Sequence, residues 1–143
     1  MEAILLIGIQ GSGKTTFYRD HFSQTHARIS LDLLKTRRRE KETMQACLQS
    51  GQPFVIDNTN VRRAERQAYI DSAKSAGFRV IGYFFDTPLG EAIRRNKLRS
   101  GREVIPVAGI AGTLKRLERP SIDEGFDELH TVSCDQREAG VSK

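Results

Sequence analysis

Residues 3–16, AILLIGIQGSGKTT, decide the fold that we expect for this chain. Residues 3–7 are apolar without a break and end at a glycine, which is typical of a strand covered on both faces in a parallel sheet. Residues 8–15 then match the pattern G-x-x-x-x-G-K-S/T, and a helix is expected from residue 14 to about residue 23. A strand, a glycine-rich loop and a helix in this order predict a phosphate-binding loop at the start of an α/β domain.

The chemistry of this loop explains each of its residue types. Glycines let the backbone approach phosphate oxygens and turn several N–H groups inward, and the helix that follows adds the positive end of its dipole. We expect Lys14 to contact the β- and γ-phosphates of ATP and Thr15 to hold Mg²⁺ through its hydroxyl. A chance match in a glycine-containing turn is the alternative, and the flanking strand and helix argue against it. The predicted ATP-binding residues are Gly8, Ile9, Gln10, Gly11, Ser12, Gly13, Lys14, Thr15 and Thr16.

Length and composition indicate one globular domain. The chain has 143 residues, 38% of them hydrophobic, which excludes a disordered or collagen-like protein. Its longest apolar runs are far shorter than the roughly 20 residues that span a membrane, and no secretory signal follows Met1. The two cysteines, Cys47 and Cys134, share no metal-site or disulfide spacing, so we expect thiols in a reducing cytoplasm. We expect the domain to cover residues 1–134 and residues 135–143 to form a disordered tail.

Short apolar runs alternate with longer amphipathic stretches along the rest of the chain, as in βα units around a parallel sheet. Further strands are expected at residues 28–30, 54–56, 79–85 and 129–132. Further helices are expected at residues 31–49, from the N-cap Asn60 to Gly77, and after Pro88 and Pro106. The apolar side of the helix that ends at Gly77 is expected to carry Val61, Ala64, Ala68, Tyr69 and Ala76.

Two aspartates are candidates for the chemistry around the loop. Asp57 follows the strand at residues 54–56, so it is expected at the same sheet edge as the loop, where it can hold Mg²⁺ through water or touch the acceptor. Asp32 lies where the strand at residues 28–30 passes into a helix, and a carboxylate there can take the proton of a hydroxyl acceptor. The alternatives are a turn aspartate at residue 57 and a first-turn helix acid at residue 32.

Basic residues gather in two runs, KTRRREK at residues 35–41 and RRNKLRSGR at residues 94–102. Taken alone, each run is typical of a solvated helix face. Arg95 and Arg99 are four residues apart, so they share one face of a helix, and a serine and a glycine follow as a flexible joint. This arrangement predicts a lid whose two guanidinium groups close over bound phosphates. The net charge of +5 is compatible with a polyanionic partner.

Five segments of the sequence together resemble one known family. In chain order they are GIQGSGKTT (residues 8–16), FVIDNTN (54–60), RRAERQAYIDSAKSAGF (62–78), RRNKLRSG (94–101) and RLERPSIDEGF (116–126). The kinase domain of polynucleotide 5′-hydroxyl kinases and their small bacterial predicted-kinase relatives has similar segments in this order, and the resemblance covers residues 3–132. It implies an α/β fold of the P-loop kinase type, with a five-stranded parallel sheet in the order 2-3-1-4-5 flanked by helices.

The resemblance also implies roles for individual residues. The lysine and threonine that end the loop match residues that hold the donor triphosphate and Mg²⁺. Asp32 matches the general base that acts on the acceptor 5′-hydroxyl, and Asp57 matches the acid of the Asp-Asn-Thr-Asn motif. Arg95 and Arg99 match lid arginines that clamp the donor phosphates.

The sequence departs from the family at two places. Ser30 and Leu31 stand before Asp32, where the family often has Asn-Arg, and Lys35 stands where it often has Arg. Lys35 can still attract an acceptor phosphate, as a point charge rather than a two-pronged contact. The predicted acceptor-binding residues are therefore Asp32, Lys35 and Asp57. The departure weakens the expectation of a nucleic-acid 5′ end more than the expectation of kinase chemistry.

The sequence therefore predicts an ATP-dependent, Mg²⁺-assisted kinase that phosphorylates a hydroxyl, with a polynucleotide 5′-hydroxyl as the favoured acceptor. One alternative is a small-molecule kinase of the same fold that acts on a nucleoside, a sugar nucleotide or an antibiotic. Another is an NTP-binding switch with little transfer activity. A basic nucleic-acid-binding protein without catalysis would leave the loop at residues 8–15 unexplained. The expected partners are ATP and the acceptor, with no membrane and no obligate protein partner.

Overall fold

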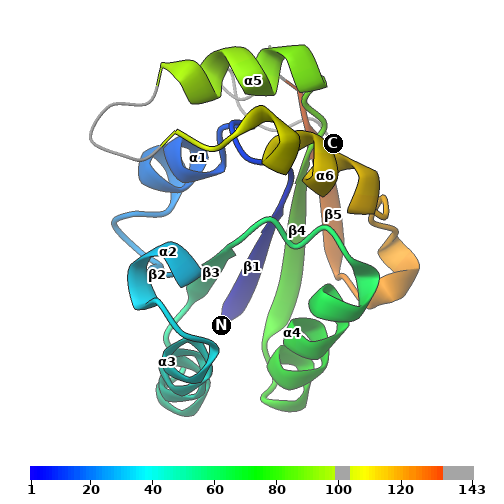
Figure 1. The fold of residues 1–143 in the computed structure, drawn as a ribbon. Helices are drawn as coiled ribbons and strands as arrows, with labels where there is room; N and C mark the ends of the chain where they lie inside the picture. The colour runs from blue at the N-terminus through cyan, green and yellow to red at the C-terminus, as the bar shows by residue number, and fades with distance from the viewer. Residues whose placement is uncertain (99–103, 134–143) are drawn as a thin grey trace.

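The structure, a computed structural model, describes residues 1–98 and 104–133. Within these residues one parallel sheet is formed by β1 (Glu2–Ile7), β2 (Ala27–Ile29), β3 (Phe54–Asp57), β4 (Arg79–Phe85) and β5 (Glu128–Val132). The order across the sheet is β2-β3-β1-β4-β5, with β1 at the centre (Figure 1). The predicted five-stranded parallel sheet and its order are confirmed. Because all strands run in one direction, the loops after β1, β2 and β3 meet at the carboxyl edge of the sheet.

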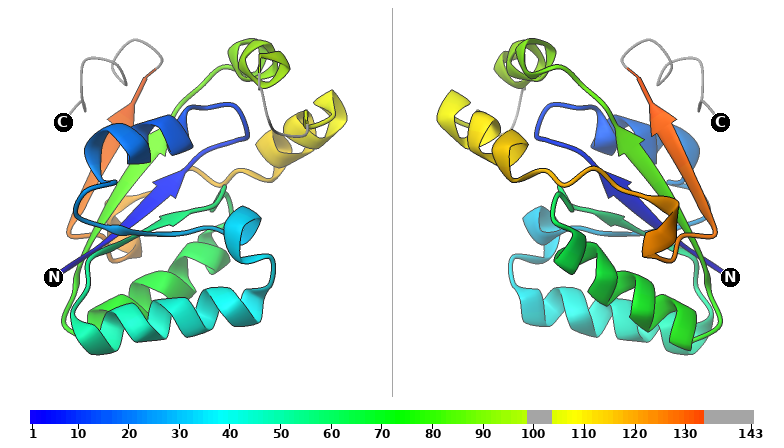
Figure 2. Two further views of the ribbon diagram at one scale, coloured as in Figure 1. Left: turned by 90° about the vertical axis from the view of Figure 1, so that its left-hand side faces the viewer. Right: turned by 90° about the vertical axis from the view of Figure 1, so that its right-hand side faces the viewer.

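Helices cover both faces of the sheet and its carboxyl edge. They are α1 (Lys14–His21), α2 (Leu31–Leu34), α3 (Arg37–Ser50), α4 (Arg63–Ser75), α5 (Leu89–Lys97), α6 (Val107–Arg116) and the short 3₁₀ helix η1 (Ile122–Glu124). Figure 2 shows α3 and α4 on one face, α1 on the other, and α5 with α6 beyond the carboxyl ends of the strands. None of the helices in the described part of the chain is long and apolar enough to cross a membrane.

The central strand β1 is buried on both of its faces. Leu5 belongs to the core cluster that contains Met44 of α3 and Ile70 of α4, whereas Leu6 belongs to the cluster that contains Phe17 of α1. Both leucines are fully buried. Successive side chains of a strand point to opposite faces, so an unbroken apolar run needs cover on both sides. The strand predicted from residues 3–7 is therefore confirmed together with its surroundings.

A third apolar cluster joins the loop after β1 to the helices at the carboxyl edge. Ile9 of this loop is 2% exposed and clusters with Ala92 of α5 and Ile110 of α6. These two helices begin directly after Pro88 and Pro106, as predicted. Burial of Ile9 therefore holds the loop against α5 and α6.

The predicted helix at residues 31–49 is two helices in the structure. α2 ends at Leu34, Lys35 has a φ of 73°, and the Thr36 hydroxyl caps α3 by accepting the Arg39 N–H at 3.2 Å. A positive φ interrupts a helix, and a threonine is a good N-cap because it satisfies an N–H that the first turn leaves unpaired. Thr36 is therefore the sequence signal for the break, and it stands inside a basic run that resembles one continuous helix.

The prediction that Asn60 is the N-cap of the following helix is wrong. Asn60 has a φ of 51°, and its side-chain amide donates to the Leu6 carbonyl at 2.7 Å and the Ile56 carbonyl at 3.4 Å. It therefore ties the ends of β1 and β3 together, whereas α4 begins at Arg63 with Arg62 as its N-cap. Asparagine tolerates positive φ as well as capping positions, so the residue type alone does not separate the two roles.

The buried side of α4 also differs in part from the predicted one. Its buried residues are Arg66, Tyr69, Ile70 and Ala73. Of the residues expected on the apolar side, Val61 and Tyr69 are buried, but Ala64, Ala68 and Ala76 are exposed. Alanine buries little apolar area, so the larger Tyr69 and Ile70 decide which face turns toward the sheet.

Some sequence features fall on parts of the chain that the structure does not describe. Arg99 of the predicted lid, Cys134 and the tail expected at residues 135–143 all lie outside the described residues. Cys47 is a free thiol buried in the core, as its isolation in the sequence predicts.

Candidate active site

A cleft of about 660 Å³ lies at the carboxyl edge of the sheet. Its walls come from the loop after β1, the first turns of α1 and α2, the ends of β2 and β3, and α5. The predicted site residues that line it are Gln10, Gly11, Ser12, Gly13, Lys14, Thr15, Thr16, Asp32, Asp57 and Arg95. The fold thus brings together side chains that were predicted from separate parts of the sequence.

The loop after β1 curls tightly against α5. Gly11 has a φ of 79°, and a Cβ built at this position would collide with the carbonyl oxygen of Ala92 in α5. Gly13 has a φ of 95° at the start of α1. Side chains other than glycine rarely adopt these conformations, so both glycines are required by the path of the loop.

Gly8 and Ile9, also predicted to bind ATP, support the loop from behind and do not line the cleft. The Gly8 N–H donates to the Thr59 carbonyl at 2.9 Å, which joins the loop to the Asp-Asn-Thr-Asn segment after β3. Ile9 is buried against α5 and α6. These two residues therefore fix the shape of the loop from its inner side.

Lys14 brings a positive charge to the floor of the cleft. The residue is 9% exposed, and its ammonium donates to the carbonyls of Gly8 at 2.8 Å and Ile9 at 2.9 Å and to the Ser12 hydroxyl at 3.4 Å. An ammonium has three N–H donors, and here all three acceptors are uncharged oxygens of the loop. Anionic phosphate oxygens form stronger, charge-assisted hydrogen bonds with such a group.

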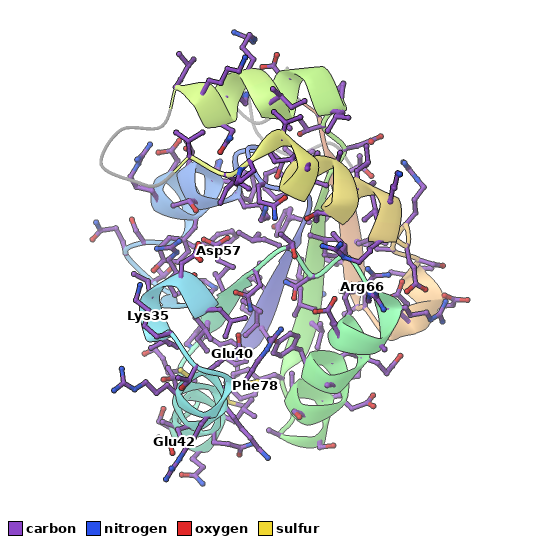
Figure 3. All side chains as sticks on the ribbon, in the orientation of Figure 1. Lys35, Glu40, Glu42, Asp57, Arg66 and Phe78 are labelled. Atoms are coloured by element: carbon purple, nitrogen blue, oxygen red, sulfur yellow. The ribbon has the colours of Figure 1, made fainter. Side chains whose placement is uncertain are left out.

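Thr15 and Asp57 bring a hydroxyl and a carboxylate together next to Lys14. The Thr15 hydroxyl donates to Asp57 Oδ2 at 3.2 Å. Asp57 ends β3 directly beside Leu6 of β1 and is 6% exposed. Figure 3 shows Asp57 at the carboxyl end of its strand. Hydroxyl and carboxylate oxygens are the hard ligands that Mg²⁺ prefers, so this pair fits a metal that phosphate oxygens complete.

Arg28 is a site residue that sequence reasoning missed. Its Nε donates to Asp57 Oδ2 at 2.8 Å, and one of its terminal nitrogens donates to Thr15 Oγ1 at 3.3 Å. The Arg28 side chain is 14% exposed and lines the cleft. The available signal is its position next to the carboxyl end of the edge strand β2, where a charged side chain can turn toward the neighbouring strand.

Asp32 lines the cleft from the first turn of α2. Its N–H donates to the hydroxyl of Ser30, the N-cap of this helix, at 3.2 Å. The preceding N–H, that of Leu31, donates to Asn58 Oδ1 at 2.9 Å. The segment after β3 therefore holds the turn that carries Asp32, although the two are far apart in the sequence.

Behind this turn lies a buried carboxylate, Glu40 of α3, which is 4% exposed. It accepts hydrogen bonds from Asn58 Nδ2 at 2.7 Å, the Tyr69 hydroxyl at 2.7 Å and the Arg37 guanidinium at 3.1 Å. Burial, together with the bond to Glu40, raises the pKa of Tyr69 above its ordinary value. Sequence reasoning missed Glu40 because it stands in a run of basic residues that is typical of an exposed helix face.

The cations around the cleft differ from the predicted set. Arg95 lines it as expected, and its Nε donates to Glu91 of the preceding turn at 3.0 Å. Arg28 and Arg37 line it from the side of α2. Lys35, predicted to attract an acceptor phosphate, is exposed and does not line the cleft. Figure 3 shows Lys35 at the end of α2, where it is the C-cap residue.

Comparison with known proteins finds one matching protein family and several similar proteins. A family model described as an AAA domain matches residues 34–120, more than half of the chain. A relative from Acanthamoeba polyphaga mimivirus, provisionally named a bifunctional polynucleotide phosphatase/kinase, is 31% identical over 139 residues. The bifunctional polynucleotide phosphatase/kinase of Schizosaccharomyces pombe is 25% identical over 135 residues. Each match covers 92% of this chain and 33% of the relative, so the chain spans about a third of the length of these relatives.

Solved structures share the fold at low sequence identity. An unliganded sugar kinase from Janibacter sp. HTCC2649 has a TM-score of 0.76 and 18% identity, covering 97% of this chain and 89% of the other. Kti12 from Chaetomium thermophilum, solved in complex with ADP-AlF3, has a TM-score of 0.72 and 20% identity, covering 96% and 92%. Together with the family match, this likeness shows that the chain belongs to the AAA domain family and has the P-loop kinase fold.

Proposed function

We propose that this protein is a kinase that transfers the γ-phosphoryl group of ATP to a hydroxyl, with a polynucleotide 5′-hydroxyl as the favoured acceptor. The observation that supports the proposal is the composition of one cleft. Lys14, Thr15 and Asp57 line it on the side of the phosphate loop, and Asp32 lines it from α2. A donor site and a carboxylate from another element are what phosphoryl transfer to a hydroxyl requires.

Each of these residues has a distinct role in the proposed reaction. Lys14 neutralises the β- and γ-phosphates, and Thr15 with Asp57 holds the metal. A bound Mg²⁺ supplies positive charge to the phosphate oxygens. Asp32 takes the proton from the acceptor hydroxyl as its oxygen bonds to the γ-phosphorus and the bond from that phosphorus to the β-phosphate oxygen breaks, which releases ADP. Arg95 stabilises charge on the phosphates from the side of α5, and Arg99, which lies outside the described residues, is proposed to do the same.

The polynucleotide acceptor is supported by the curated relatives, which are named polynucleotide phosphatase/kinases. The charge pattern favours a second candidate, a small uncharged hydroxyl compound. Arg28 pairs with Asp57, and Arg37 pairs with Glu40 and Glu65, so the cations on the α2 side already face carboxylates. A solved structure of similar fold is a sugar kinase.

A labelling experiment separates these candidates. The protein is incubated with γ-labelled ATP, Mg²⁺ and a panel of 5′-hydroxyl DNA and RNA oligonucleotides, nucleosides and sugars. We expect label on an oligonucleotide, with an apparent affinity that falls steeply as salt rises, because a polyanion releases counterions on binding. Label confined to a nucleoside or a sugar would establish the second candidate. ATP hydrolysis without any labelled acceptor would contradict both and support a nucleotide switch.

The role of Asp32 is tested by Asp32→Asn. This change keeps the size of the side chain but removes the base, so we expect transfer to fall by at least about 100-fold while ATP still binds. Phosphate transfer and nucleotide affinity are measured on the same preparation. Asp71→Asn, at an exposed carboxylate of α4 outside the cleft, is the matched control and is expected to transfer normally. Transfer near the wild-type rate in Asp32→Asn would remove this residue from the mechanism.

A further inference from the structure

Arg28 contacts both of the candidate metal ligands, Thr15 and Asp57. Its guanidinium donates to Asp57 Oδ2 at 2.8 Å and to Thr15 Oγ1 at 3.3 Å, and these two oxygens lie 3.2 Å from each other. The arginine, the hydroxyl and the carboxylate therefore form a closed triangle of hydrogen bonds. Arg28 is not part of the phosphate-loop motif at residues 8–15, so the motif assigns it no role.

The triangle is held from the surrounding fold. The side chain of Asp57 is 3% exposed and that of Arg28 is 14% exposed, so water screens their attraction weakly. Arg28 lies in β2 opposite Val55, and Asp57 ends β3, so pairing of the two strands sets the approach of the two side chains. An ion pair in such a place is stronger than one on the surface.

A metal ion on these ligands conflicts with this arrangement. Mg²⁺ binds oxygens at about 2.1 Å, closer than any guanidinium donor, and demands a regular geometry around itself. A guanidinium that donates to the same hydroxyl and carboxylate would then face a divalent cation across a few ångströms. Like charges at that distance repel strongly, so the guanidinium and a metal ion compete for the Thr15 hydroxyl and the Asp57 carboxylate.

We propose that the Arg28 guanidinium takes the place of the metal while the site is empty. It stabilises Thr15 and Asp57 in that state, and a metal ion that binds to these two residues displaces it. The inference rests on the proposed nucleotide and metal site but not on the identity of the acceptor. Arg28 thereby sets how strongly nucleotide binding depends on Mg²⁺. Since the guanidinium lines the cleft, the exchange also leaves a positive charge in the cleft that Asp32 lines.

The test is the effect of Mg²⁺ on ADP affinity, measured by titration calorimetry in EDTA and in saturating Mg²⁺. The ratio of the two affinities is compared between the wild-type protein and Arg28→Gln. We expect the ratio to rise at least about tenfold in the variant, because metal binding to the wild-type protein must first break the charged hydrogen bonds of Arg28 to Thr15 and Asp57, and the loss of one such bond changes an equilibrium by about tenfold. Direct binding of Mn²⁺ to the protein–ADP complex, followed by electron paramagnetic resonance, is expected to tighten likewise.

Arg19→Gln is the matched control. Arg19 also lines the cleft, but it forms an ion pair with Asp20 rather than with the metal ligands. We expect this change to weaken ADP binding equally in EDTA and in Mg²⁺, so that the ratio stays constant. The same behaviour in Arg28→Gln would overturn the inference, since Arg28 would then be an ordinary phosphate contact.

Two further outcomes keep the inference distinct from the proposed function. If Arg28→Gln does not fold, Arg28→Lys decides, because it keeps the charge but lacks the fork that reaches both oxygens, and its ratio is expected to rise by a smaller factor. An unchanged ratio in Arg28→Lys would then overturn the inference. Failure of the wild-type protein to bind ADP in either condition would overturn the proposed function and the inference together.

Discussion

Gly11 lies where the backbone of the phosphate loop meets the backbone of α5. Its φ of 79° and the collision that a Cβ would make with the Ala92 carbonyl are two independent reasons for glycine at this residue. The side chain of Ile9 fixes the same contact from the core. A shift of α5 would therefore also move the phosphate loop.

We expect Gly11→Ala to lower the free energy of unfolding by about 1–3 kcal/mol, because a backbone conformation that alanine disfavours would be combined with a clash. ADP binding should weaken as well, since the loop N–H groups would shift. Urea unfolding and ADP titration measure the two effects. Gly90→Ala in α5 is the control, since a Cβ there meets nothing within 4 Å. An equal loss of stability in both variants would contradict this account.

At the scale of elements, one buried carboxylate connects three of them. Glu40 of α3 accepts from Tyr69 of α4 and from Asn58 of the segment after β3. Asn58 Oδ1 accepts the Leu31 N–H of α2, so the amide orientation is set from both ends. The helix turn that carries Asp32 is thus positioned by a network whose centre lies outside the cleft.

The network predicts that two glutamates of α3, Glu40 and Glu42, contribute unequally to the free energy of unfolding. Glu40→Gln replaces one acceptor oxygen by an amide that faces the existing donors, so we expect a loss of about 1–3 kcal/mol in the free energy of unfolding. Glu42 is 64% exposed and pairs with Arg38, so Glu42→Gln should cost less than about 1 kcal/mol. Figure 3 shows the two side chains on different sides of α3. Urea denaturation of both variants checks the difference, and equal losses would exclude a special role for Glu40.

At the scale of the whole molecule, a buried ion pair joins α4, near the middle of the chain, to η1 near its end. Arg66 of α4 donates to Glu124 of η1 through two nitrogens, at 2.7 Å and 3.0 Å, and the two side chains are 0% and 1% exposed. Its third nitrogen donates to the carbonyls of Asn60 and Val61. η1 leads directly into β5, so the pair fixes the approach of the last strand to the sheet.

We expect Glu124→Gln to cost about 3–5 kcal/mol of unfolding free energy, because it leaves the buried Arg66 charge without its counter-charge. Asp123→Asn, at the neighbouring carboxylate, removes a contact with Arg63 at 3.4 Å in which the Asp123 side chain is 71% exposed. That control should cost less than about 1 kcal/mol. The comparison is made by chemical denaturation, and a loss below about 1 kcal/mol in Glu124→Gln would show that the pair contributes little.

Much of the fold could be predicted from the sequence because it follows from local patterns. The apolar run at residues 3–7 and the glycine-rich loop after it identify a covered strand and its phosphate loop without any knowledge of the rest. The break at Lys35 and the role of Asn60 could not be predicted in the same way. In both cases a residue adopts a positive φ, and contacts with distant segments decide whether it does.

The candidate site could be predicted in part for the same reason. Lys14 and Asp57 sit at places that a strand end or a loop pattern defines locally, and both line the cleft. Arg28 and Glu40 are ordinary charged residues in a short strand and a basic run. The position of Arg28 next to the end of its strand is a weak local signal, and Glu40 has none. Each has one partner that lies 29 residues away, Asp57 for Arg28 and Tyr69 for Glu40.

By itself the sequence determined that a phosphate loop follows a buried strand and that an acidic residue ends another, because backbone preference and burial act over a few neighbouring residues. Only the tertiary structure decided that Arg28 and Thr15 both bind the Asp57 carboxylate. It also decided that Glu40 supports the turn that carries Asp32 and that Lys35 does not line the cleft. These contacts depend on which strands and helices become neighbours, and pairing of distant charges gains energy only once the fold has brought them together.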